Sequence, residues 1–459
     1  MSHELSRRRF LELSTATAGA VAGSGLATPA LGKTAAFRQI NPAIPNSKVV
    51  CCIDPGMVTK PSAVFPFSAQ VDAVDNARVQ TNMDGMAMAL TGKTTAGEAW
   101  ATIFRRGSKE WSQIKVAIKV NCQADQTSAT PSVIGGVCRG LIGLGVKPAN
   151  IFFYDGSTNA QAATSIESQY APFIGAGKPI PAGVKAVRSS LTRDAQGRVG
   201  QITTFIADGS TDIVINLANN KGHTFVGVGC VTLTMKNHYG TYHPAIYTDH
   251  DKIDNLILTS KRDDLVGGDP PRQQLCIVDS LWAVAARNNF SAYDKCPSCI
   301  LMGTVSGVVD YVTVKKIRGP IMGCPDTDGT RNWGVVVPEF IKGFDVTATD
   351  VEAQYTQIGR VGADASGRGG AGSDAHEVSI HVVSDGAFVT FPVAAGTPYR
   401  IAIATLDGRT MRTFAGTGGP GQRSLWDGKD ETGRRCARGT YAVQCASAGR
   451  VQASTLQLR

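Results

Sequence analysis

Apolar runs of strand length alternate with a helical pattern in the first two thirds of the chain. Residues 115–121 (KVAIKVN) form a short β-branched run, and residues 150–155 (NIFFYD) form a second one. Between them, residues 131–144 place apolar side chains at helical spacing. A strand, a helix and a strand within about 40 residues predict a βαβ unit with two parallel strands and a right-handed crossover.

Three further runs repeat the strand pattern without alternating polar positions. They are residues 212–217 (DIVINL), 275–279 (LCIVD) and 299–302 (CILM). Nearly continuous apolar strands are typical of parallel sheets that helices cover on both faces. We therefore expect an α/β core with a largely parallel sheet over residues 41–362.

The pattern changes near the C-terminus. Residues 363–377 are rich in Gly, Ser and Ala without periodicity, which predicts a linker. Over residues 378–459, short alternating runs are separated by Asp-Gly and Thr-Gly turn signals. This pattern predicts a small all-β sandwich that follows the α/β core.

The first residues have the order of an export signal. Arg7, Arg8 and Arg9 precede a weakly apolar Ala/Thr/Gly stretch and then a zone of small residues. With Phe and Leu after the arginines, residues 1–32 resemble a twin-arginine signal peptide. The resemblance implies an exported protein, periplasmic or extracellular, that crosses the membrane folded and often with a cofactor.

Composition narrows the class of partner. The chain has 459 residues, 42% of them hydrophobic and 18% charged, with a net charge of +9. Its positive charge is spread without a Lys/Arg run or interleaved aromatic residues, which argues against a nucleic-acid partner. The segments after residue 32 offer no apolar run long enough for a transmembrane span.

Lys119 and Asn121 are the first candidates for chemistry. Lys119 interrupts an apolar strand, and an ammonium buried without a partner is costly or loses its proton more readily. The two residues are two positions apart, so they share one face at the carboxyl end of the strand. Ligands of open α/β sheets bind at this edge.

A second group of donor side chains follows the run at 212–217. Carboxylates are scarce within this group until Asp249, so a pocket formed here favours a phosphate or carboxylate ligand. The group comprises Asn216, Lys221, His223, Thr224, Lys236 and Asn237.

Two structural alternatives compete with a pocket. The lysines at positions 119, 221 and 236 can be ion-paired with Asp155, Asp212 or Asp279, since parallel-sheet domains contain buried pairs. His223 can cap a loop through a hydrogen bond to the backbone.

Histidine and cysteine spacings suggest a metal as a further alternative. His238, His243, Asp249 and His250 lie within thirteen positions and could bind zinc, nickel or iron, although the spacings match no compact helical motif. Cys296 and Cys299 form a CxxC with Cys324 further on. This set could bind a metal or an iron–sulfur cluster, act as a redox pair, or form a disulfide.

The core resembles a known family. The stretches that carry the resemblance are IKVN at 118–121, KGHT at 221–224, TMKN at 234–237 with Gly240, and the aspartates Asp279 and Asp310. They occur in the order found in the domain-of-unknown-function family three-sixty-two. The resemblance implies an α/β domain over about residues 115–310 and supports the pocket residues, with both aspartates as ligand-binding positions. The ferredoxin module fused to many relatives has no counterpart, which counts against electron transfer by that route.

The C-terminal segment resembles another module. Residues 426–430 (WDGKD), Gly433 and Gly439-Thr440-Tyr441 are similar to the Ig-like domain of the flagellar hook-capping protein. The resemblance implies a module that presents or anchors, through a cell surface or self-association. We expect Trp426 and Tyr441 to fill its thin core.

Three hypotheses of function remain at this point. The first is an exported enzyme whose Lys/Asn/His pocket binds a small anionic molecule, with a lysine or His223 as acid–base group and a metal as a further Lewis acid. The second is a secreted, non-catalytic binding or adhesion protein. The third is an iron–sulfur or thiol redox protein.

Overall fold

The fold is described from a computed structural model of the chain. The description covers these residues: 37–60, 67–122, 127–156, 166–189, 191–193, 199–223, 231–242, 252–285, 293–324, 337–359, 379–383, 386–390, 396–405, 409–417, 423–447 and 450–458. The predicted signal segment and the predicted linker lie outside these residues.

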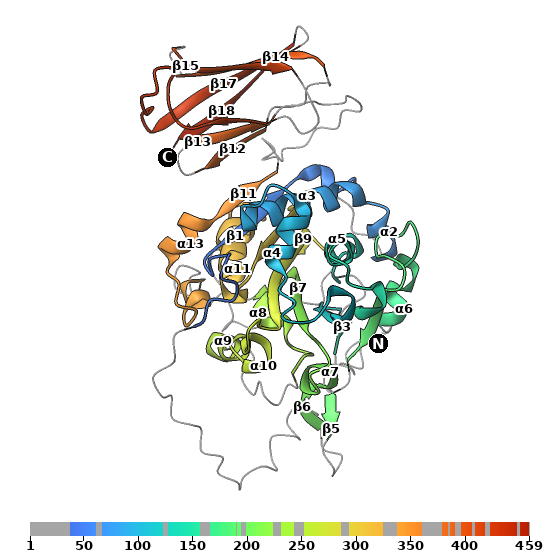
Figure 1. Cartoon of the computed structure of the whole chain (residues 1–459). Helices are drawn as coiled ribbons and strands as arrows, with labels where there is room; N and C mark the ends of the chain where they lie inside the picture. Colours follow the sequence, from blue (N-terminus) through green and yellow to red (C-terminus); the bar gives the residue numbers. More distant parts are fainter. Residues whose placement is uncertain are drawn as a thin grey trace, which may run out of the picture. The chain divides into compact units, whose positions relative to one another are not determined.

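A mixed, largely parallel sheet of nine strands forms the core (Figure 1). Its order is β11-β1-β10-β9-β7-β2-β3-β4, and β8 pairs with β7 beside this path. The strands from β9 to β4 run parallel, whereas β10 is antiparallel to both of its neighbours. The bounds are β1 Val49–Ile53, β2 Val116–Lys119, β3 Ile151–Asp155, β4 Lys185–Arg188, β7 Ile213–Gly222, β8 Val231–Thr232, β9 Gln273–Val284, β10 Cys299–Gly303 and β11 Thr356–Ile358. The predicted α/β core is confirmed.

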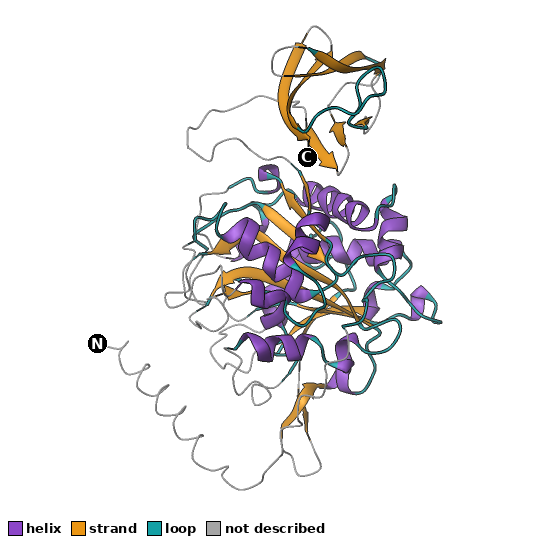
Figure 2. Ribbon diagram, turned by 90° about the vertical axis from the view of Figure 1, so that its left-hand side faces the viewer, coloured by secondary structure: helices purple, strands orange, loops and turns teal. Residues whose placement is uncertain are grey.

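Helices cover both faces of this sheet (Figure 2). On one face, α3 (Asn76–Thr91), α4 (Ala96–Ile103) and α5 (Pro131–Gly143) pack on the alternate apolar residues of the strands. On the other face lie α8 (Thr234–Asn237) and α11 (Ser306–Val312). The remaining helices and short strands are α2 Phe67–Val71, α6 Ile166–Tyr170, α7 Thr204–Ala207, α9 Ile253–Ser260, α10 Asp263–Val266, α13 Ala348–Gln354, β5 Leu191–Arg193 and β6 Val199–Thr203. Within the described residues, no helix has the length and hydropathy of a membrane span.

The predicted βαβ unit is β2, α5 and β3, and β2 pairs in parallel with β3. Pro131 occupies the first turn of α5, where its missing N–H costs no hydrogen bond. Two glycines let neighbouring helices approach α5 closely, because a Cβ at Gly136 would overlap Met83 and one at Gly140 would overlap the ring of Trp100. These contacts hold α5 against α3 and α4.

Strand β7 is longer than the pattern predicts. The apolar run ends at Leu217, yet the strand continues to Gly222. It pairs with β9, which also continues beyond its apolar run. All ten residues of β7 are buried, including Asn219, Asn220 and Lys221. The strand therefore carries a polar segment beyond the ends of β2 and β3, within the protein interior.

Two antiparallel sheets form the C-terminal module. Their strands are β12 Ser379–Val383, β13 Gly386–Thr390, β14 Pro398–Thr405, β15 Thr410–Thr417, β16 Arg423–Trp426, β17 Gly439–Ser447 and β18 Arg450–Leu458. The orders are β12-β13-β16 and β15-β14-β17-β18. Trp426 is fully buried against Tyr441, with ring centroids 5.3 Å apart, as expected for the core of the module. A small β module is confirmed, and its Ig-like identity stays a prediction.

Candidate functional site

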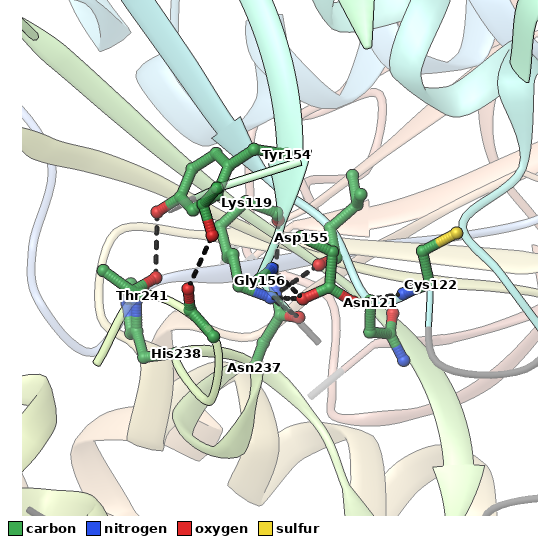
Figure 3. A network of polar contacts seen from close by, with 12 residues as sticks. Lys119, Asn121, Cys122, Tyr154, Asp155, Gly156, Asn237, His238 and Thr241 are labelled. Carbon is green, nitrogen blue, oxygen red and sulfur yellow. Dashed lines mark hydrogen bonds and ion pairs between the residues drawn. The ribbon is translucent and has the colours of Figure 1, made fainter. Parts of the chain in front are cut away.

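A buried ion pair joins the carboxyl ends of β2 and β3 (Figure 3). Lys119 Nζ lies 2.9 Å from Asp155 Oδ1 and also donates to the carbonyl of Val120 at 2.6 Å. The other carboxylate oxygen of Asp155 accepts the backbone N–H of Cys122 at 2.7 Å. Burial lowers the pKa of Lys119, and the charge of Asp155 opposes this change. Lys119 is thus ion-paired with a carboxylate. This arrangement is the structural alternative to a ligand-binding role for this residue.

Side-chain amides extend this network toward β7. Asn237 Nδ2 donates to the carbonyl of Lys119 at 3.0 Å and to Asn216 Oδ1 at 2.8 Å. Asn216 Nδ2 in turn donates to the carbonyl of Thr234 at 2.8 Å. The predicted residues Lys119, Asn216 and Asn237 therefore meet in space, but their polar atoms hold one another and the backbone.

His238 is a buried, neutral ring within the same network. Its Nε2 lies 2.5 Å from Gln273 Oε1 and 3.1 Å from Asn216 Nδ2, and its Nδ1 lies 3.3 Å from Thr241 Oγ1. Burial lowers the pKa of His238 to about 4. Both ring nitrogens have hydrogen-bonding neighbours in the core, which favours a structural role for this histidine.

Asp310 holds the N-terminal turn of α8. Its carboxylate accepts the backbone N–H of Thr234 at 2.8 Å, the hydroxyl of Thr234 at 2.5 Å and the N–H of Met235 at 2.9 Å. Burial raises the pKa of Asp310 to about 7, against the opposing effect of these hydrogen bonds. Asp310 from α11 therefore positions the segment that carries Lys236 and Asn237.

This carboxyl group predicts a pH dependence of stability. An exposed aspartate loses its proton near pH 4, whereas folded Asp310 keeps its proton to about pH 7. Between these values the folded state binds more protons than the unfolded chain, so the free energy of unfolding falls as pH rises from about 4 to about 7. In Asp310→Asn we expect this fall to shrink by about 4 kcal/mol, measured by urea unfolding at several pH values. An unchanged pH dependence in the variant would contradict this assignment.

Asp279 accepts a backbone N–H group next to the start of α5, as Asp310 does for α8. Its two oxygens accept the N–H groups of Thr130, at 2.7 Å, and Leu281, at 3.1 Å. Burial raises its pKa. Tyr293 donates to the carbonyl of Ser128 at 3.0 Å beside it. Both aspartates that the family resemblance implied as ligand-binding thus have backbone partners in this structure.

Lys221 differs from Lys119. It lies near the end of β7, is 1% exposed, and its Nζ has no hydrogen-bond partner within the described part of the chain. Burial lowers the pKa of Lys221 to about 8; Asp155 and Cys122 act against this change, and Lys119 adds to it. The Lys221 ammonium therefore lies within the charge cluster of Lys119 and Asp155, but it makes no hydrogen bond to either of these residues.

Two other donors near this edge have unused hydrogen-bonding capacity. Asn121 Oδ1 accepts the N–H of Asn219 at 2.8 Å, which fixes the amide, but among described residues Asn121 Nδ2 has no partner. Thr232 pairs with Lys221 across β8 and β7, and its buried hydroxyl also lacks a partner among these residues. These two groups and Lys221 could hold a polar ligand.

The remaining candidates of the anion pocket are placed only in part. His223 directly follows β7, and Lys236 lies on α8; both are buried and both have interaction partners. Thr224 lies outside the described residues.

The metal hypotheses are not tested by this structure. His243, Asp249 and His250 lie outside the described residues. Cys299 lies opposite Ile53 in the β1 and β10 pair and its thiol interacts with that of Cys51, whereas Cys296 Sγ contacts the carbonyl of Leu281. Cys324 is buried elsewhere, after the turn that ends near Arg318. Within the described part of the chain, no group of three His, Cys, Asp or Glu side chains could hold a metal ion.

Arg318 is a site residue that the sequence pattern does not reveal. It is 1% exposed, and its guanidinium donates to Asn220 Oδ1 at 2.7 Å and to the carbonyl of Val284 at 3.1 Å. Its segment, KKIRG, has the charge pattern of an exposed helix face. No local signal indicates that its last basic residue turns inward to join β7 and β9.

Comparison with known proteins agrees with the arrangement of the core. No curated protein matches the chain. Residues 116–315, which build β2 to β10 and α11, match the model of the family described as "Domain of unknown function (DUF362)", and this match confirms the resemblance of the core to that family.

Proposed function

We propose that the α/β core binds a small anion, a phosphate or a carboxylate, at Lys221. The observation that carries this proposal is the 1% exposed ammonium with no hydrogen-bond partner among the described residues. Burying an ion without a partner costs several kcal/mol, so a fold that keeps one is expected to use it. A bound anion would supply the missing countercharge.

The neighbouring charges support an anion rather than a cation. The carboxylate of Asp155 is already engaged by Lys119 and by the backbone of Cys122. Among the described residues, Nζ of Lys221 and Nδ2 of Asn121 have no partner and can only donate, and the unpartnered hydroxyl of Thr232 can donate as well. Such a donor set matches the oxygens of a phosphate or carboxylate.

The location of the site also supports ligand binding. Lys221 and Asn121 lie at the carboxyl ends of parallel strands, where open α/β sheets bind their ligands. The twin-arginine-type pattern at residues 1–32 supports the same activity outside the cytoplasm.

Isothermal titration of the full chain with orthophosphate and with oxalate tests this proposal. We expect binding to the wild type and a loss of affinity of roughly tenfold to a hundredfold in Lys221→Met, since a charged hydrogen-bonding partner is removed. Lys115→Met is the matched control, because Lys115 is exposed before β2. Equal affinity in wild type and Lys221→Met, or no binding of either anion to the wild type, would overturn the proposal.

A further inference from the structure

We propose that Lys221 is a nucleophilic amine that forms an imine with the carbonyl carbon of a small 2-oxo acid. The inference rests on the anion site proposed above and names the class of its substrate. The geometry that supports it is a buried amine that makes no hydrogen bond to the part of the chain that the structure describes, near a second cation, Lys119, and near two donors that also lack partners there.

The first requirement of an imine-forming lysine is an amine that can lose its proton. Hydrogen bonds to acceptors stabilise the ammonium, and Lys119 makes three, to Asp155, Val120 and Asn237. Lys221 makes none within the described residues, and the charge of Lys119 acts against its own. Desolvation and a neighbouring cation are the two conditions that activate a lysine as a nucleophile. The lowered pKa of Lys221, about 8, agrees with this geometry.

The second requirement is a set of donors for the substrate's oxygens. Asn121 is held by its Oδ1 to Asn219, so its Nδ2, which has no partner among the described residues, has a defined direction. Thr232 lies directly across from Lys221 in the β7 and β8 pair, and its buried hydroxyl has no partner among the same residues. Both can donate to a carboxylate or to the oxygen of a carbonyl under attack.

The reaction balances without an oxidant or a reductant. The neutral Nζ attacks the carbonyl carbon, and proton transfer gives a carbinolamine. The proton that the ammonium released before the attack returns to the hydroxyl of the carbinolamine, which leaves as one molecule of water, and the C=N bond of the protonated imine forms. The protonated imine keeps the positive charge of the original ammonium, so it remains paired with the carboxylate of the same substrate.

The test is trapping with glyoxylate, the smallest 2-oxo acid, and cyanoborohydride. Cyanoborohydride delivers hydride to the imine carbon and leaves a stable secondary amine, which intact mass and peptide mapping detect. Near pH 7.5, a lysine of pKa about 8 has roughly a hundredfold more neutral amine than an ordinary lysine. We therefore expect labelling at Lys221 to be at least tenfold faster than at Lys115, and to be faster with glyoxylate than with acetaldehyde, which has no carboxylate.

Two substitutions of Lys221 distinguish the loss of the amine from a loss of the folded state, because binding and labelling are measured for both. Lys221→Arg keeps a cation but has no nucleophilic amine, so we expect it to bind oxalate and to lose the fast labelling. Lys221→Met should lose the fast labelling and bind oxalate roughly tenfold to a hundredfold more weakly. Labelling of wild type and Lys221→Arg to the same extent, or labelling of Lys221 no faster with glyoxylate than with acetaldehyde, would overturn the inference. Oxalate binding to the wild type without trapping at Lys221 would overturn the imine alone and leave the anion site standing, because oxalate forms no imine.

Discussion

Replacement of Lys221 by methionine is expected to stabilise the folded chain by about 1 to 3 kcal/mol at pH 7, while it weakens anion binding roughly tenfold to a hundredfold. Methionine fills a similar volume and carries no charge that must be desolvated. The unfolded chain binds the Lys221 proton more tightly than the folded state does, because the folded pKa is about 8 and the ordinary value is 10.5. Urea unfolding of the full chain measures the difference.

The same variant has a defined pH dependence. The penalty from Lys221 is fully present below about pH 8 and disappears as pH rises toward 10.5, where both states lose the proton. The stability of the wild type should therefore approach that of Lys221→Met over this range. Lys115→Met, an exposed control, should stay within about 0.5 kcal/mol of the wild type. A less stable Lys221→Met at pH 7 would show that Lys221 is a satisfied structural residue.

Replacement of Lys119 by methionine has the opposite expected effect. It leaves the carboxylate of Asp155 buried without its cation, and breaking such a pair costs about 3 to 5 kcal/mol. The backbone donors of Cys122 and Gly156 remain, but they carry no net charge. We expect a corresponding loss in the free energy of unfolding, measured in urea at pH 7.

A double-mutant cycle tests whether the loss comes from the pair. In Lys119→Met with Asp155→Asn both charges of the pair are removed together, so the two losses should not add, with a coupling of about 1 to 3 kcal/mol. Additive losses would contradict a direct pairing of Lys119 with Asp155. Together, the two lysine variants separate a cation that holds the fold from one that is free for a ligand.

Much of the core could be predicted from the pattern of the sequence. The run at 115–121, the helix at 131–144 and the run at 150–155 became β2, α5 and β3, because apolar periodicity determines which faces are buried. The carboxyl-end position of Lys119 followed from the same pattern. Its pairing with Asp155 was one of the alternatives that the residues left open.

The parts that could not be predicted depend on contacts between distant segments. Leu217 looked like the last residue of its strand, since Asn219, Asn220 and Lys221 are polar, yet pairing with β9 and β8 keeps them extended. Asp310 turned out to hold the first turn of a four-residue helix, too short to be seen as a periodic pattern. The inward turn of Arg318 depends on Asn220, 98 positions away.

The C-terminal module, too, could be predicted from the sequence only in part. The aromatic pair Trp426 and Tyr441 could be assigned to its core because large rings fill a thin sandwich. The strands β13 and β16 are short, five and four residues, and their pairing joins segments that are distant along the chain. The turn signals therefore predict the kind of module and not the order of its strands.

Proton uptake on anion binding tests the central claim about Lys221 most directly. Calorimetric titration with oxalate at about pH 8.5, in buffers of different ionisation enthalpy, reports the protons bound with the anion. Since an anion beside Lys221 raises its pKa from about 8, we expect uptake of roughly half a proton by the wild type and by Lys115→Met. Binding without proton uptake, or the same uptake in Lys221→Met, would contradict an anion site built on Lys221.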